Sequence, residues 1–154
     1  MKLESFSDFA KFMLIIDEGE KSLPYDDATS KPVRCIGKLT IGIGRNLTDR
    51  GLSPDEIDYI FQNDLNIVVK DALSIFPKFS TYSLNRKLAI CNMLFMGKYK
   101  FLGFTEMIRA IKNEDWKRAA VEAQDSKWFR QTKSRGPRVV RLFLEQGDPY
   151  GFTA

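Results

Sequence analysis

The chain has 154 residues, which favours a single domain, and its net charge is +4. Hydrophobic residues make up 44% of it, enough to bury a core without help from disulfides or metals. The chain contains no histidine, which excludes Ser-His-Asp and Cys-His catalysis and most zinc sites. We therefore expect no metal and no cofactor, and we expect acid–base chemistry to fall to other side chains.

Neither the N-terminus nor any apolar run points to a membrane. No apolar run approaches the length of a membrane span, and residues 1–8 lack the form of a signal peptide. We expect a protein made in the cytoplasm without stable membrane insertion. Its two cysteines, Cys35 and Cys91, have no partner close in sequence, which favours free thiols; a disulfide between them is the alternative.

Residues 8–18 are expected to form the first helix. Apolar residues recur there at helical spacing, at Phe9, Met13 and Ile16. Ser7 or Asp8 can cap its start, and Gly19 can end it.

Residues 23–45 have a different character. Their short β-compatible runs are separated by prolines and glycines, and comprise residues 23–25, 34–36 and 39–43. This pattern predicts a small, irregular antiparallel sheet.

A long helix is predicted from Ser53 to Phe76. Ser53 is a suitable N-cap, Pro54 suits the first helical position, and Glu56 can complete a capping box. Pro77 stops the helix after about six turns. Such a helix can act as a strut between two packing units.

The rest of the chain is also predicted to be helical. Residues 83–97 are apolar on one side and are expected to form the central helix of this part. Shorter helices are expected at 104–112, 116–124 and 137–145, with Asn113 and Ser126 as caps.

The predicted fold class is therefore α+β, mostly α, in a single domain of residues 1–154. We expect a β-containing N-terminal lobe of about 14–52, a connecting helix of 53–77, and a helical C-terminal lobe of 78–154 together with 1–13.

Two carboxylates nine positions apart suggest a sugar-cleaving site. Glu18 lies in the last turn of its helix, where the helix dipole and partial desolvation favour the protonated form that a general acid needs. Asp27 lies in polar company and is expected to stay ionised. For any one of the 20 acidic residues a solvated surface charge is the alternative, and Asp17 fits that description.

Several motifs in register give the chain a family resemblance. The first helix ends in Glu18-Gly19, a Tyr-x-Asp turn ends at Asp27, and Thr-Ile-Gly-x-Gly begins at Thr40. Further segments follow in the same order, at 52–56, 61–64, 92–95, 103–105, 116–120, 126–129 and 131–135. The chain resembles the T4 lysozyme family of phage muramidases (glycoside hydrolase family 24), which implies a lysozyme-like fold.

The resemblance implies three catalytic residues. Glu18 resembles the general acid, Asp27 the carboxylate that activates water, and Thr40 the threonine that helps to hold that water. By composition alone, Thr40 could equally be an ordinary strand residue.

The resemblance also implies substrate-binding positions at Asn46, Phe95, Glu122 and Arg135. By helical spacing alone, Phe95 could belong to the core. Arg135 could be a surface charge, and its pairing with Glu18 would oppose the acid role. The chain departs from the family in a longer segment between Asp27 and Thr40 and in Glu122, where the family has asparagine.

The implied activity is inverting hydrolysis of the β-1,4 bond between N-acetylmuramic acid and N-acetylglucosamine in peptidoglycan, which causes bacterial lysis. The implied protein is a monomeric phage endolysin, made in the host cytoplasm and released to the wall by a holin. A tail or prophage lysozyme and a catalytically inactive wall-binding protein are the alternatives.

A basic helical nucleic-acid binder is another interpretation. Its basic residues are Lys127, Arg130, Lys133, Arg135, Arg138 and Arg141. Because Glu145 and Asp148 dilute this patch, a solvated charged face is favoured, and we expect no nucleic-acid partner.

Overall fold

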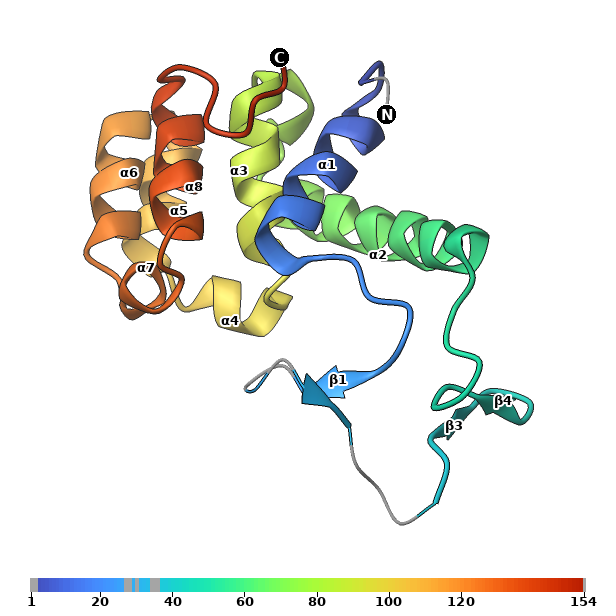
Figure 1. Cartoon of the computed structure of the whole chain (residues 1–154). Coiled ribbons are helices and arrows are strands. Elements are labelled where there is room, and N and C mark those ends of the chain that lie inside the picture. The colour runs from blue at the N-terminus through green and yellow to red at the C-terminus, as the bar shows by residue number, and fades with distance from the viewer. Residues whose placement is uncertain (1–2, 27–28, 30, 34–36, 154) are drawn as a thin grey trace.

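A computed structural model of the whole chain describes residues 3–26, 29, 31–33 and 37–153 (Figure 1). The α+β, mostly helical class predicted from the sequence is confirmed. The helices are α1 (Phe6–Glu18), α2 (Pro54–Ile75), α3 (Leu84–Leu94), α4 (Lys98–Leu102), α5 (Thr105–Lys112), α6 (Trp116–Gln124), α7 (Lys127–Gln131) and α8 (Arg135–Leu144), with a 3-10 turn, η1 (Phe79–Thr81).

The first helix is capped differently from the prediction. Its N-cap is Ser5, whose hydroxyl accepts a hydrogen bond from the Asp8 amide at 3.2 Å. The Asp8 carboxylate in turn accepts from the Ser5 amide at 2.8 Å, so Asp8 is the far member of a capping box and not the cap itself. Gly19 ends the helix as predicted, with a φ of 77°.

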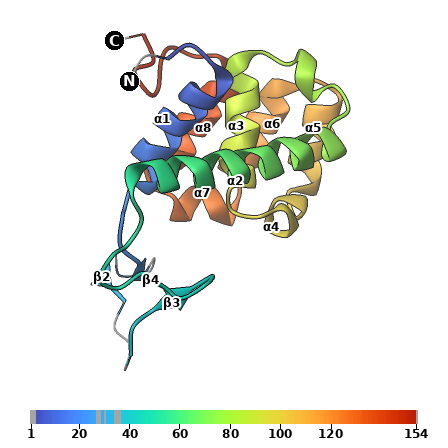
Figure 2. The same cartoon turned by 90° about the vertical axis from the view of Figure 1, so that its right-hand side faces the viewer.

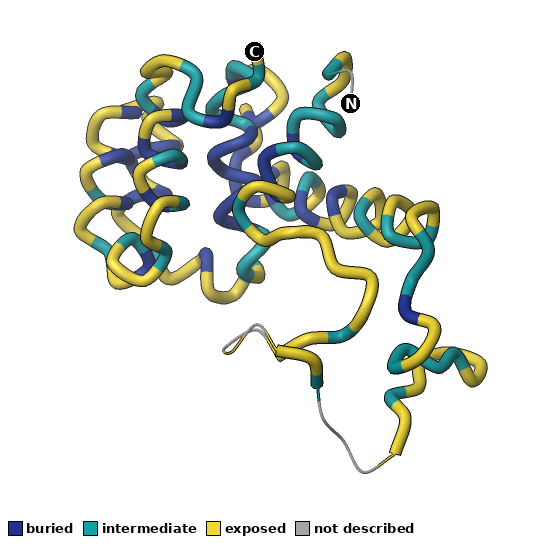
Figure 3. The backbone as a smooth tube through the Cα atoms, in the orientation of Figure 1, coloured by how far each residue is buried: buried dark blue, intermediate teal, exposed yellow. Residues whose placement is uncertain are grey.

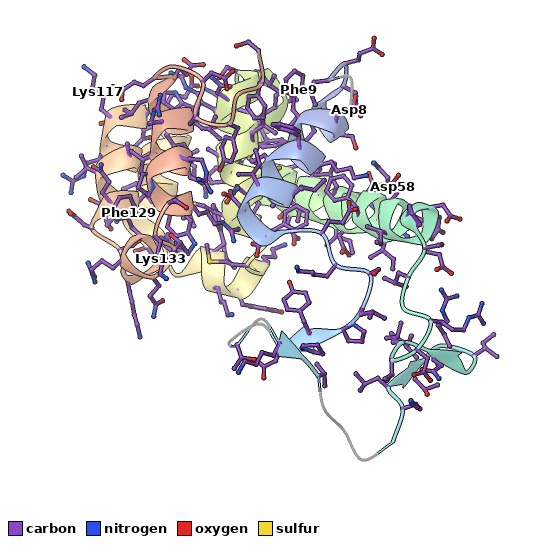
Figure 4. The ribbon with its side chains drawn as sticks, viewed as in Figure 1. Asp8, Phe9, Asp58, Lys117, Phe129 and Lys133 are labelled. Carbon is purple, nitrogen blue, oxygen red and sulfur yellow. The ribbon has the colours of Figure 1, made fainter. Side chains whose placement is uncertain are left out.

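The long helix α2 begins as its sequence predicts. Ser53 is the N-cap, and its amide donates to the Glu56 carboxylate at 2.9 Å. Two polar links join α2 to α1: Gln62 donates to the Ser7 hydroxyl at 2.7 Å, and Lys11 pairs with Asp58, which projects from α2 in Figure 4.

The β-region forms two separate ribbons instead of the single sheet expected. Strands β1 (Tyr25–Asp26) and β2 (Lys31–Pro32) pair antiparallel, and so do β3 (Thr40–Ile41) and β4 (Arg45–Asn46). Each strand has two residues, because prolines and glycines interrupt any longer ladder. The expected run at 34–36 lies outside the described residues. In Figures 1 and 2 the ribbons lie below α2, away from the packed helices.

The core lies in the helical body around α3, as predicted for the central helix. Helix α3 packs against α1, α2 and α8, and its residues from Leu88 to Leu94 are buried (Figure 3). Cys91 is a free thiol there, and burial raises its pKa to about 12, so it is chemically inert. Cys35 lies outside the described residues.

Helices α4 and α7 and the turn η1 were not predicted. Each has five residues or fewer, too short a stretch for a helical period to show in the sequence. Both predicted caps are confirmed: Ser126 is the N-cap of α7, and Asn113 is the C-cap of α5. Within the residues that the structure describes, no helix combines the length and apolarity needed to span a membrane.

Gly51 allows the β-region to dock at the start of α2. Its φ is 59°, and a Cβ atom at this position would lie 2.3 Å from the carbonyl oxygen of Ser22. The neighbouring Leu52 amide donates to that same oxygen at 2.8 Å. This contact holds the segment after α1 against the segment before α2, and it leaves no room for a side chain.

Gly51→Ala is therefore expected to destabilise the protein by about 2 kcal/mol or more, from backbone strain together with the clash. The free energy of unfolding in urea measures the loss. Gly42→Ala is the matched control, because Gly42 has the same φ of 59° but a Cβ atom added to it would meet no atom within 4 Å. Equal losses in the two variants would show that the contact with Ser22 is unimportant.

Candidate active site

A cleft of about 530 Å³ lies where α1, α2 and α3 meet. We call it the α1–α2 cleft. Its walls are largely apolar, built from Leu14, Ile15, Leu52, Ile57, Ile60, Phe61 and Phe95. Charged side chains also line it, among them Glu18, Lys11 and Asp64. A largely apolar hollow with a few placed polar groups is the usual form of a ligand site.

Glu18 reaches this cleft because it is the last residue of α1, where Gly19 turns the chain away. Its side chain is 49% exposed, and one carboxylate oxygen accepts a hydrogen bond from the guanidinium of Arg135. Arg135 begins α8, so this ion pair joins two helices far apart in sequence. The Glu18 carboxyl group is thus accessible to a ligand, and its orientation is fixed by Arg135.

Arg135 is itself held by a buried amide. Its Nε donates to the side-chain oxygen of Asn92 at 2.8 Å, and its Nη2 donates to the main-chain oxygen of Asn92 at 2.8 Å. Asn92 lies on α3 and has no exposed surface. Two bonds from one rigid residue fix the plane of the guanidinium that faces Glu18.

Asp17 anchors the other side of the same network. Its Oδ2 accepts from the Asn92 amide at 2.7 Å and from the Tyr150 hydroxyl at 2.6 Å, and its Oδ1 accepts from the Arg138 Nε at 3.1 Å. Burial, with the nearby Asp17 charge, raises the pKa of Tyr150, so its hydroxyl stays protonated and donates.

Asp17 is therefore not the surface charge expected from the sequence, since its side chain has 0% exposure. Sequence reasoning missed both Asp17 and Asn92. One signal was present: Asn92 is the one amide side chain in the apolar run from Leu88 to Leu94, and a buried amide must find partners.

Phe95 follows α3 and lines the cleft, where its ring stacks on that of Phe61 with centroids 6.4 Å apart and an interplanar angle of 12°. It is packed against the core on one side and faces the cleft on the other. The core interpretation and the cleft interpretation thus describe two sides of one ring.

Thr40 and Asn46 lie on the β3–β4 hairpin, directly opposite each other in the strand register. The Thr40 hydroxyl donates to the Lys38 carbonyl oxygen at 3.2 Å, and the Asn46 amide donates to Asp49 at 2.8 Å. Among the described residues that line the α1–α2 cleft, neither is present.

Glu122 lies on α6, in a separate hollow of about 220 Å³ with Phe104 and Ser126, and it pairs with Arg118 at 2.5 Å. Asp27 lies outside the described residues. The structure thus brings Glu18 and Phe95 to one cleft, places Arg135 in contact with Glu18, and leaves Thr40, Asn46 and Glu122 apart from that cleft.

Arg45 fastens the base of the hairpin to α2. Its Nη2 donates to the Gly51 carbonyl oxygen at 2.9 Å, and its Nη1 donates to Glu56 at 2.8 Å. Hydrogen bonds from the Ser53 amide, and then from Arg45, lower the pKa of Glu56 to about 2. One carboxylate therefore serves both the start of α2 and the attachment of the hairpin.

The low pKa of Glu56 predicts a loss of stability in acid. Because the folded pKa lies below the usual 4.5, the stabilisation is complete above about pH 4.5 and is lost as the pH falls towards 2. Urea midpoints at pH 6, 4.5 and 3 should therefore fall more steeply for the wild type than for Glu56→Gln. Parallel curves would contradict the role assigned to this carboxylate.

The helical body around α3, the long α2 and the small antiparallel ribbons define an α+β, lysozyme-like fold. The chain is 27% identical, over an alignment of 163 residues, to probable T4-type lysozyme 2 of Dictyostelium discoideum, covering 86% of this chain and 92% of that protein. It is 29% identical to the pre-baseplate central spike protein Gp5 of Enterobacteria phage T4, covering 86% of this chain but 27% of that protein. No protein-family model matches the chain. The resemblance to T4-type lysozymes predicted from the motifs is confirmed.

Proposed function

We propose that this chain is a muramidase that cleaves the β-1,4 bond between N-acetylmuramic acid and N-acetylglucosamine in peptidoglycan. One observation carries the proposal: Glu18 ends α1 at the wall of a cleft, held by Arg135. The likeness to a T4-type lysozyme over 86% of the chain supports a hydrolase of this general type.

In this mechanism Glu18 protonates the leaving oxygen of the glycosidic bond. Its contact with Arg135 gives way when the substrate enters, because the leaving oxygen must take the place of the guanidinium beside the carboxyl group. Asp27, assisted by Thr40, activates a water on the opposite face of the sugar. The reaction inverts the anomeric centre, which requires the two carboxyl groups to lie roughly 6.5–9.5 Å apart.

The glycan strand is proposed to run through the α1–α2 cleft. The exposed side of Phe95 offers an apolar surface to a sugar ring, and Arg135 offers a cation beside the reacting bond. Asn46 and Glu122 are proposed to contact more distant parts of the strand. The chain acts as a monomer, and it lyses bacteria as an endolysin after holin-type release.

The test is digestion of purified peptidoglycan, with release of reducing ends measured over time. Proton NMR of the first products gives their anomeric form, and inversion predicts the α-anomer from the β-linked substrate. A chain that sediments with the wall but releases no reducing ends would be an inactive wall-binding protein. Products that first appear as the β-anomer would refute inversion while leaving hydrolysis intact.

A further inference from the structure

Tyr99 presents a whole aromatic ring to solvent. It lies on α4 and is 92% exposed. Within the part of the chain that the structure describes, no hydrogen bond, ring stacking or cation contact involves it. A tyrosine offers a large contact area and loses little conformational freedom when a ligand covers it. The ring is therefore available to a ligand from outside the chain.

The helix that carries this ring is held in place from two sides. Phe101 has no exposed surface, and its ring meets that of Phe76 edge-on, with centroids 6.1 Å apart. The Lys98 ammonium donates to the Asp71 carboxylate at 2.8 Å and to the Ser74 hydroxyl at 3.1 Å, both on α2. Tyr99 lies between these two anchored residues, so a fixed element presents its ring.

Tyr99 lies close to the α1–α2 cleft along the chain. It follows Phe95, which lines that cleft, by four residues, so at most about 14 Å of extended chain separates the two. In Figures 1 and 2, α4 lies on the lower side of the helical body, the side on which the β-ribbons lie. A long ligand that leaves the cleft past Phe95 in this direction can therefore reach Tyr99.

The chemistry around the ring favours a glycan strand of the bacterial wall. The faces of sugar rings carry C–H groups that pack on an aromatic ring, while their hydroxyls stay in water. Helix α4 has two lysines and no acidic residue, and among the described residues Lys100 has no ion pair. Because peptidoglycan carries carboxylates, a free cation beside the ring is complementary to it.

We propose that Tyr99 stacks on a sugar ring of the glycan strand at a distance from the bond that is cut. It would extend the binding surface beyond the α1–α2 cleft. The choice of a peptidoglycan strand as the ligand rests on the proposed function. Because the ring does not touch the reacting bond, Tyr99 is a binding residue, and its contribution is to affinity.

The test is the binding of a β-1,4-linked hexamer of N-acetylglucosamine, titrated by NMR in a Glu18→Gln background so that the probe is not cut. Tyr99→Ala removes the ring, and Tyr99→Phe keeps it. Tyr59→Ala is the matched control, because Tyr59 is also exposed, at 70%, but lies on α2 and is absent from the lining of the cleft. Substitutions at such exposed positions leave the fold intact.

We expect Tyr99→Ala to raise the dissociation constant of the hexamer about three- to tenfold, the fold-change typical of one aromatic contact. Tyr99→Phe and Tyr59→Ala should bind like their parent, and sugar C–H protons should shift upfield wherever residue 99 keeps its ring. An unchanged dissociation constant in Tyr99→Ala would overturn the assignment. Tyr99 ring signals that shift with protein concentration alone would also overturn it, because a second copy of the chain would then cover the ring.

Hydrolysis of peptidoglycan separates this assignment from the proposed function. Tyr99→Ala should raise KM by the same factor and leave kcat unchanged, because only binding away from the reacting bond is lost. If the chain binds the hexamer through Tyr99 but releases no reducing ends, the muramidase function fails and the glycan contact stands. If hydrolysis proceeds with the same KM in both proteins, the glycan contact fails and the muramidase function stands.

Discussion

Replacing Glu18 with glutamine is expected to slow peptidoglycan hydrolysis by a factor of about 10² to 10⁴, the usual contribution of general acid–base catalysis. The amide has nearly the same shape as the carboxylic acid but has no acidic proton to give to the leaving oxygen. Glu18 is half exposed and touches Arg135 at the rim of the cleft, so the substitution should cost up to about 1 kcal/mol of stability. The release of reducing ends at equal concentrations of folded protein measures the effect.

Glu114→Gln is the matched control for this experiment. It makes the same chemical change in an exposed ion pair with Lys78, and neither residue of that pair lines the cleft. Its rate of hydrolysis should equal that of the wild type. Undiminished release of reducing ends by Glu18→Gln would remove Glu18 from the mechanism, whatever the control shows.

Asp17→Ala is expected to lower the free energy of unfolding by about 3–5 kcal/mol, the loss typical of removing one partner from a buried ion pair. The change leaves the Arg138 guanidinium without its carboxylate, and it also removes the acceptor used by Asn92 and Tyr150. Because Asn92 orients Arg135, the loss should spread to the group that faces Glu18. Urea unfolding followed by circular dichroism measures it.

Asp58→Ala is the control that separates burial from charge. Asp58 also pairs with a cation, Lys11, but its side chain is 54% exposed. An exposed ion pair contributes at most about 1 kcal/mol. If the free energy of unfolding falls by a similar amount in the two variants, the burial of Asp17 has no energetic consequence. The network around Asp17 would then contribute little to the stability of the fold.

The elements that could be predicted are those whose signals are local. Helix α2 begins at a capping box whose members lie three residues apart, and Gly19 ends α1 by a conformation that only a few residues adopt readily. The position of Glu18 at a helix end follows from the same signal. Such features depend only on residues that are neighbours along the chain, so the sequence alone is enough to predict them.

The elements that could not be predicted depend on partners far away in the sequence. Glu18 and Arg135 are separated by 117 positions, and Asp17 and Tyr150 by 133. No periodicity in the sequence indicates these long-range contacts. By its sequence position, Asp17 is therefore indistinguishable from any acidic residue beside a turn. The division of the β-region into two ribbons likewise depends on which strands pair. The prolines and glycines of residues 23–45 limit the length of each strand but do not determine its partner.

The link between Asp17 and Tyr150 has a consequence for the order in which the molecule can assemble. The ribosome makes α1 before the guanidinium of Arg138 and the hydroxyl of Tyr150, which bind the Asp17 carboxylate. Before these residues are made, docking α1 into the helical body would bury the Asp17 carboxylate without a partner. The C-terminal end of α1 is therefore expected to stay exposed to solvent until then. The cleft can therefore take its final form only after residue 150 has been made, and contacts of such long range slow its completion.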